Sequence, residues 1–225
     1  CQQVLDWCSA DGLNLLINNA GFLDVTEEIE NKCTAEILAS ITNWNKHINV
    51  LLKAPVIFTK YLVNPLRLAS SAPLKYDGGV YDGSIINISS IASAELVAPA
   101  ISPYCTCKAA LNMLTKLTAK ELSAKYRIRC NAIKFGGVDT QIPYKGGWTK
   151  HGWQGLVDTQ PIGRIGSIND SDQIMLFLAD KQKSGFVTGA CLNIDGGFGC
   201  VGSMGNEYGK TNAEKANPFV NQSKL

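Results

Sequence analysis

Four short apolar stretches alternate with longer helical stretches along the 225-residue chain, and this alternation constrains the fold more than any other feature. The expected strands cover residues 13–18, 84–89, 127–133 and 190–194, and the expected helices cover residues 2–10, 44–66, 103–126 and 169–179. Strands that alternate with helices pack as a parallel sheet with helices on both faces. We therefore predict an α/β fold with a doubly wound parallel sheet, in one domain of residues 1–198, followed by a polar C-terminal tail of residues 199–225.

The charge balance gives no support to two classes of partner. The formal net charge is only +2, which provides no basis for binding nucleic acid or an anionic membrane surface. No apolar run reaches the roughly 18 residues that a membrane-spanning helix needs. One basic cluster is expected to form a solvated rim where a helix ends and a strand begins: Lys125, Arg127, Arg129 and Lys134.

The cysteines and histidines argue against a disulfide framework and against a bound metal. The eight cysteines are scattered, and none forms a Cys-x-x-Cys motif. The two histidines, His47 and His151, are far apart in the sequence, so we expect no metal site. Free thiols in a reducing compartment are the simplest interpretation, and we expect a cytoplasmic protein.

Tyr104 and Lys108 have the spacing of a pair on one helix face, at the start of the helix expected over residues 103–126. Side chains four residues apart lie one turn from each other. A free tyrosine titrates near pH 10, and a nearby ammonium favours the phenolate, so Lys108 should lower the pKa of Tyr104. Taken alone, this spacing arises more often from ordinary helix packing than from catalysis.

Other polar residues follow the expected strands. Ser90 comes at the end of the second strand, and Asn18 to Gly21 come at the end of the first. The carboxyl ends of parallel strands are where open α/β sheets place their ligands. A serine hydroxyl there can hold a carbonyl oxygen while a tyrosine supplies its proton. Asn49 interrupts an apolar helical stretch and is expected to be a buried polar side chain with a partner.

Together these motifs resemble the short-chain dehydrogenase/reductase family. In chain order they are Asn18-Asn19-Ala20-Gly21, the helical Asn49, Ile88-Ser89-Ser90, Tyr104 with Lys108, and Asp195-Gly196-Gly197. The similarity extends from about residue 2 to residue 198. It implies a Rossmann-like fold and hydride transfer between NAD or NADP and a small-molecule carbonyl or alcohol substrate. A homo-oligomer is implied as well.

The resemblance also implies roles for individual residues. Tyr104 would exchange a proton with the substrate oxygen, and Lys108 would lower the pKa of Tyr104 and bind the nicotinamide ribose. Ser90 would orient the substrate oxygen, and Asn49 would hold a water that relays protons to Lys108. The cofactor-binding residues implied in the same way are Asn19, Ala20, Gly21, Tyr104, Lys108, Val138 and Thr140.

The chain departs from the family pattern in three places. Phe135 stands where the family usually has proline before Gly136, which leaves the course of the nicotinamide loop open. The interval between Ser90 and Tyr104 is one residue longer than the pattern. The family's N-terminal β-α-β-α-β portion, which carries the Gly-rich phosphate loop, is missing from the sequence, and we expect residues 13–18 to form an exposed edge strand.

Two questions stay open from the sequence. Residues 141–160 combine aromatic residues with glycines, and they form either a lid over an apolar ligand or a loop packed on its own domain. The protein is either an oxidoreductase or a truncated, non-catalytic interaction protein that retains the dehydrogenase fold. The presence of Ser90, Tyr104 and Lys108 together favours the enzyme, because a purely structural protein has no physical need for this combination.

Overall fold

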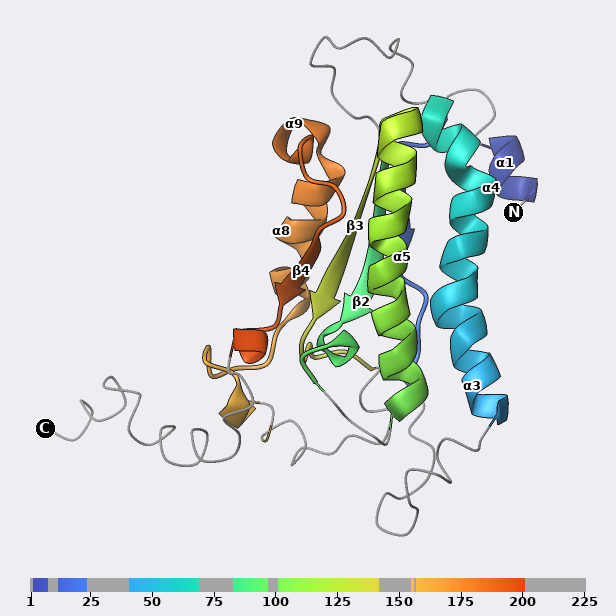
Figure 1. Ribbon diagram of the computed structural model, residues 1–225. Helices are drawn as coiled ribbons and strands as arrows, with labels where there is room; N and C mark the ends of the chain where they lie inside the picture. The colour runs from blue at the N-terminus through green and yellow to red at the C-terminus, as the bar shows by residue number, and fades with distance from the viewer. Residues whose placement is uncertain are drawn as a thin grey trace, which may run out of the picture.

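The computed structural model describes residues 2–7, 12–23, 41–68, 83–96, 101–141, 155 and 157–200. At its centre lies a four-stranded parallel sheet in the order β1-β2-β3-β4 (Figure 1). The strands are β1 (Leu15–Asn18), β2 (Gly83–Ser90), β3 (Ile128–Phe135) and β4 (Cys191–Ile194). All four strands predicted from the sequence are present, and all three pairings between them are parallel, which confirms the predicted sheet.

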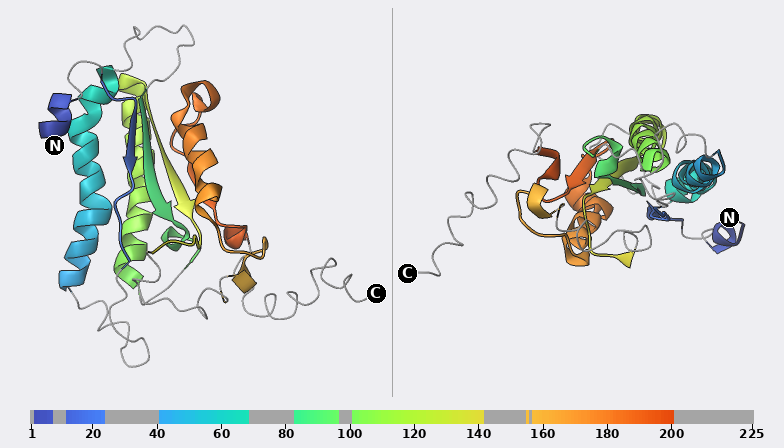
Figure 2. Two further views of the ribbon diagram at one scale, coloured as in Figure 1. Left: turned by 180° about the vertical axis from the view of Figure 1, so that it is seen from behind. Right: turned by 90° about the horizontal axis from the view of Figure 1, so that it is seen from below.

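Helices cover both faces of the sheet (Figure 2). One face carries α4 (Ala54–Leu68) and the long α5 (Ser102–Tyr126), and the opposite face carries α8 (Ile168–Ala179). Shorter helical segments in the described part are α1 (Gln2–Trp7), α3 (Ile41–His47), η3 (Ile91–Ser93), α9 (Lys181–Ser184) and η5 (Phe198–Cys200). The two-sided arrangement confirms the doubly wound α/β fold.

Neighbouring side chains of the strands divide between two apolar cores. Ile85 of β2 and Cys130 of β3 are buried on the side of α4 and α5. Ile86 and Ile133 are buried on the other side, against Leu178 of α8. Successive side chains of a strand point to opposite faces, so a strand that is covered on both sides needs an almost continuous apolar run. This requirement explains why the central strands stand out in the sequence.

The helix expected over residues 44–66 is present but changes type along its length. α3 continues through a π-helical segment, η2 (Ile48–Lys53), into α4. At the end of η2 the Ala54 N–H donates to the carbonyl oxygen of Asn49, five residues earlier. Pro55 follows directly, and a proline has no N–H for the regular ladder of an α-helix. We attribute the wider turn to this proline; π segments are frequent at functional sites.

The basic residues expected to form a solvated rim are mostly buried, so that expectation was wrong. Arg127, Arg129 and Lys134 are 7%, 0% and 9% exposed. Arg129 Nη1 donates to the carbonyl oxygens of Leu178, at 2.9 Å, and Ser184, at 3.2 Å. The last carbonyl groups of a helix lack partners within the helix and attract cations. The ends of α8 and α9 therefore explain how a charged side chain of β3 can be buried.

Several sequence predictions fall wholly or partly outside the described residues. The helix expected over residues 2–10 is present as α1, and residues 8–11 lie outside the description. Of residues 141–160 the structure describes only 141, 155 and 157–160, and of the expected tail only residues 199 and 200. Within the described part, β1 pairs with β2 alone and forms an edge of the sheet, as expected. No helix there has the length and apolar character needed to cross a membrane.

Candidate functional site

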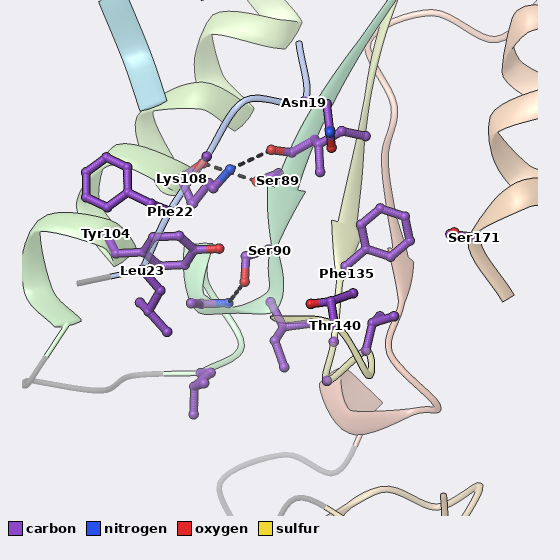
Figure 3. Close-up of a pocket in the computed structure, with 18 of the residues that line it drawn as sticks. Asn19, Phe22, Leu23, Ser89, Ser90, Tyr104, Lys108, Phe135, Thr140 and Ser171 are labelled. Carbon is purple, nitrogen blue, oxygen red and sulfur yellow. Dashed lines mark hydrogen bonds between the residues drawn. The ribbon is translucent and has the colours of Figure 1, made fainter. Parts of the chain in front are cut away.

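A pocket of about 300 Å³ lies at the carboxyl ends of the parallel strands. Its lining comes from the segment after β1, the end of β2 with η3, the first turns of α5, the turn after β3 and one face of α8 (Figure 3). The lining residues that the sequence predicted as functional are Asn19, Gly21, Ser90, Tyr104, Lys108, Val138 and Thr140. The carboxyl edge is where open α/β sheets bind their ligands. The fold thus brings most of the predicted site together.

Tyr104 and Lys108 lie one turn apart on α5, and both line the pocket (Figure 3). The helix begins at Ser102, with a proline in its first turn, where the missing N–H of proline has no partner to lose. Lys108 is 5% exposed, and its Nζ donates to the carbonyl oxygen of Ile88 at 2.6 Å. The same nitrogen lies 5.5 Å from the centre of the Tyr104 ring. The ammonium is therefore fixed between β2 and the tyrosine.

Ser90 ends β2 and faces the pocket beside Tyr104 (Figure 3). Its Oγ accepts a hydrogen bond from the backbone N–H of Ala92 at 3.1 Å, which fixes the oxygen at the start of η3. The Ser90 hydroxyl also lowers the pKa of the neighbouring Tyr104 phenol in part. Two hydroxyl groups thus converge on one point of the pocket, and together they can bind a carbonyl or alcohol oxygen.

The pKa of Tyr104 moves in the direction opposite to the prediction. Burial raises this pKa above its ordinary value, the hydrogen bond with Ser90 lowers it only in part, and Cys105 raises it further. The expectation that Lys108 sets a low pKa for Tyr104 was therefore wrong. Burial also lowers the pKa of Lys108 itself, to about 8. Burial is the largest cause of both pKa shifts.

Asn49 was expected to be a buried polar side chain, and this was wrong. The residue is exposed and does not line the pocket. It belongs to η2, where its carbonyl oxygen accepts the hydrogen bond from Ala54. The neighbouring Leu51 is the residue that points inward, at 1% exposed. Leu51 approaches Gly21 of the pocket wall, since a Cβ on that glycine would lie 3.4 Å from Leu51 Cδ2.

A series of hydrogen bonds between buried polar side chains lies next to the carboxyl ends of the strands, and it was not predicted from the sequence. Asn18 Nδ2 donates to Asn87 Oδ1 at 2.8 Å, and Asn87 Nδ2 donates to Thr115 Oγ1 at 2.9 Å. Thr115 Oγ1 in turn donates to the carbonyl oxygen of Leu111 at 2.8 Å. These hydrogen bonds link β1, β2 and α5. Asn87 and Thr115 gave a visible signal, because each is a polar residue in an otherwise apolar face.

The segment after β1 contributes Asn19 and Gly21 to the lining, whereas Ala20 is exposed and does not line the pocket. Phe22 and Leu23, which the sequence reasoning did not single out, also line it (Figure 3). Their position directly after the motif of residues 18–21 could have indicated this. The asparagine-rich turn therefore combines a structural residue, Asn18, with pocket residues that follow it.

The turn after β3 forms the opposite wall of the pocket. Phe135 ends the strand, and its ring lines the pocket, so the aromatic residue replaces the expected proline as part of the wall (Figure 3). A Cβ on Gly136 would lie 2.7 Å from the Cα of Asp195, so only glycine fits there. Val138 forms a parallel bridge with Gly166, which fixes the turn that carries Thr140.

The residues of the pocket fit the nicotinamide half of a dinucleotide. Gly21 packs beside the ammonium, since a Cβ on this glycine would lie 3.9 Å from Lys108 Nζ. A lysine ammonium has three N–H donors, and one of them binds Ile88. Lys108 and Asn19 would hold the ribose, and Phe135 and Val138 offer apolar surface to a flat ring. No cluster of three or more potential metal ligands exists among the described residues.

Comparisons with known proteins agree with this geometry. The family model described as enoyl-(acyl carrier protein) reductase matches residues 3–199. An uncharacterized oxidoreductase of Thermotoga maritima is 31% identical over 194 residues, which cover 83% of this chain and 66% of that protein. L-xylulose reductase of Mesocricetus auratus is 31% identical over 211 residues, which cover 88% of this chain and 75% of that protein.

Solved structures show the same fold. A gluconate 5-dehydrogenase from Burkholderia cenocepacia J2315, in complex with NADP and tartrate, matches with a TM-score of 0.70 and 25% sequence identity. The match covers 88% of this chain and 69% of that chain. The Rossmann-like fold is thereby confirmed. This chain spans 66% of the length of the Thermotoga protein.

Proposed function

The chain belongs to the short-chain dehydrogenase/reductase family, and we propose that it transfers a hydride between NAD or NADP and a small carbonyl or alcohol substrate. The observation that carries this proposal is the convergence of Ser90, Tyr104 and Lys108 on one pocket. When bound, the nicotinamide supplies or accepts the hydride. The residues of the chain then bind the substrate oxygen and move a proton to or from it.

Tyr104 is the proton donor in this proposal. A phenol with a raised pKa stays protonated at neutral pH, and its hydroxyl faces the pocket beside Ser90 (Figure 3). Such a group can give its proton to a substrate oxygen that becomes negative when the carbonyl carbon receives a hydride. The reverse reaction needs the phenolate, which burial opposes. The raised pKa of Tyr104 therefore suits it to donate a proton when a carbonyl is reduced.

Lys108 supplies the next proton and binds the nicotinamide ribose. With a pKa of about 8 it is protonated at neutral pH but gives up its proton more readily than an exposed lysine does. Its position beside the Tyr104 ring allows it to return a proton to the phenolate. Ser90 orients the substrate oxygen through its hydroxyl.

Asn49 stays in the proposal as the residue that holds a water for Lys108. The support is that Leu51, two residues after Asn49 in η2, packs against Gly21, which lies beside Lys108 Nζ. Replacing Asn49 with alanine should lower turnover at least tenfold without weakening cofactor binding. Unchanged turnover would remove Asn49 from the mechanism.

The lining between the two hydroxyl-bearing residues points to an apolar substrate. The described pocket residues that follow Ser90 and precede Tyr104 are Ile91, Ala92, Leu96 and Ile101. A polyhydroxylated substrate would lose hydrogen bonds to water against such a surface, at about 1–3 kcal/mol for each unpaired group. An added methylene would instead gain about 0.8 kcal/mol by burial, roughly fourfold in kcat/KM. We propose a ketone or aldehyde with apolar substituents as the substrate.

A panel of carbonyl compounds tests the function and the substrate class separately. The loss of NAD(P)H absorbance is followed with unbranched 2-alkanones of increasing length and with L-xylulose. We expect kcat/KM to rise about fourfold per methylene until the pocket is filled, and to exceed the value for L-xylulose. A preference for L-xylulose would overturn the substrate class and leave the hydride transfer intact. The absence of both turnover and cofactor binding would overturn the hydride transfer itself.

We also propose that the protein forms a homo-oligomer through α4 and α5, which lie side by side (Figure 1). Large apolar side chains are exposed on both helices: Val56, Ile57, Phe58, Tyr61, Met113 and Leu117. Size-exclusion chromatography with light scattering tests this, and a monomer at micromolar concentration would contradict it. A cytoplasmic location remains part of the proposal; the described cysteines are free thiols, and cell fractionation would test it.

A further inference from the structure

A buried ion pair lies close to Ser90. Lys134 of β3 and Glu95, in the loop after η3, form a salt bridge with side chains only 11% and 16% exposed. Asn193 Nδ2 donates to the same carboxylate oxygen, Glu95 Oε1, at 3.2 Å. Burying two charges costs the free energy of their hydration, which two apolar residues would not lose. The ion pair is therefore weak evidence for a gain in stability. Its position relative to the pocket suggests another use.

Glu95 belongs to a short loop, residues 90–96, here called the serine loop because it begins with Ser90. Inside the loop the Glu95 N–H donates to the carbonyl oxygen of Ile91 at 2.8 Å. The Ala92 N–H donates to Ser90 Oγ at 3.1 Å. Hydrogen bonds thus link Ser90, Ile91, Ala92 and Glu95 within one short loop.

Polar contacts tie the serine loop to other elements. Asn112 Nδ2 of α5 donates to Ser93 Oγ at 2.7 Å. On the side of the sheet, Asn193 Nδ2 also lies 3.2 Å from Asp195 Oδ2, which accepts the N–H of Gly199 at 2.9 Å. A Cβ on Gly199 would lie 2.9 Å from Glu95 Cγ. The turn after β4 therefore packs directly on the side chain of Glu95.

We propose that Lys134 and Glu95, with Asn193, hold the serine loop against β3 and β4 and thereby set the position of the Ser90 hydroxyl. Neither charged residue lines the pocket, so both are positioning residues that act through Ser90. The carboxylate is suited to this because it accepts from donors on two different strands at once. The effect on turnover rests on the hydride transfer proposed above.

A neutral double variant, Glu95→Gln/Lys134→Met, separates positioning from stability. It removes both charges at similar side-chain length and leaves no unpaired charge buried, so it should unfold at nearly the wild-type temperature. We expect kcat to fall at least tenfold while KM for the cofactor stays unchanged, because a small misplacement of a positioning group costs up to about 10² in rate. Wild-type kcat in the folded double variant would overturn the proposal.

The matched control is the exposed pair of α5, in the variant Glu121→Gln/Lys125→Met, whose side chains are 64% and 60% exposed. It removes the same two charges far from the serine loop and should leave kcat unchanged. A tenfold loss in the control as well would show that the loss of charge alone, rather than the position of Ser90, lowers turnover.

Amide hydrogen exchange gives a readout that does not depend on activity. The Ala92 N–H, which binds Ser90 Oγ, should exchange at least tenfold faster in the double variant than in the wild-type protein. Asn193→Ala is a second variant with an exposed side chain, and several-fold faster exchange at Ala92 is expected there. If the wild-type protein has no turnover, the proposed hydride transfer is wrong, and the amide exchange rate of Ala92 alone tests the positioning role. Unchanged exchange at Ala92 in both variants would overturn the positioning role.

Discussion

Replacing Asn87 with alanine should destabilise the protein by about 2–4 kcal/mol. Asn87 is 2% exposed and joins Asn18 Nδ2, at 2.8 Å, to Thr115 Oγ1, at 2.9 Å. The variant leaves the Asn18 amide as a buried donor without a partner, at about 1–3 kcal/mol, and Thr115 loses one accepted bond, at about 1 kcal/mol. Since single domains are stable by about 5–15 kcal/mol, the variant should still fold.

Urea unfolding followed by tryptophan fluorescence measures this change. The control is Asn64→Ala on the exposed side of α4, which should change the free energy of unfolding by less than about 0.5 kcal/mol. The double variant Asn18→Ala/Asn87→Ala should be more stable than the sum of the single changes predicts, by about 1 kcal/mol, because no donor is left unpaired. A loss below about 1 kcal/mol in Asn87→Ala, or strict additivity, would refute this reasoning.

Two further variants probe the pocket walls. Lys108→Met should lower turnover at least a hundredfold and raise the stability of the fold at neutral pH. The folded state lowers the lysine pKa from 10.5 to about 8. The gain in stability is therefore full below pH 8 and disappears as the pH rises towards 10.5. Thermal unfolding across this pH range checks it, and a gain that grows with pH would contradict it. Gly136→Ala should destabilise by about 1–3 kcal/mol, since its Cβ would meet the Asp195 backbone. Gly155→Ala, with open space around it, is the control, and equal unfolding temperatures in the two variants would count against the steric argument.

The strands and the central pair of the site could be predicted because local rules decide them. A strand covered on both sides needs a continuous apolar run, and β2 and β3 have one. The spacing of Tyr104 and Lys108 places them on one helix face in any α-helix, and their helix follows a strand end. Nothing from distant parts of the chain is needed for either prediction.

The features that could not be predicted depend on distant partners. Arg129 is buried because carbonyl groups at the ends of α8 and α9, some fifty residues later in the chain, accept its hydrogen bonds. Asn49 is exposed because a π segment, rather than a regular α-helix, rotates the side chains around it. The raised pKa of Tyr104 results from its burial, and the spacing of residues along a helix does not reveal how deeply a side chain is buried.

The most direct test of the central claim is the variant Tyr104→Phe, measured for both turnover and cofactor binding. The change removes one hydroxyl from the pocket and leaves the ring beside Lys108. The control is Tyr126→Phe at the far end of α5, which should leave turnover unchanged. We predict that Tyr104→Phe loses carbonyl reduction by at least 10² while its affinity for NAD(P)H stays within a few-fold of wild type. Wild-type turnover in Tyr104→Phe would contradict the assignment of Tyr104 as the proton donor.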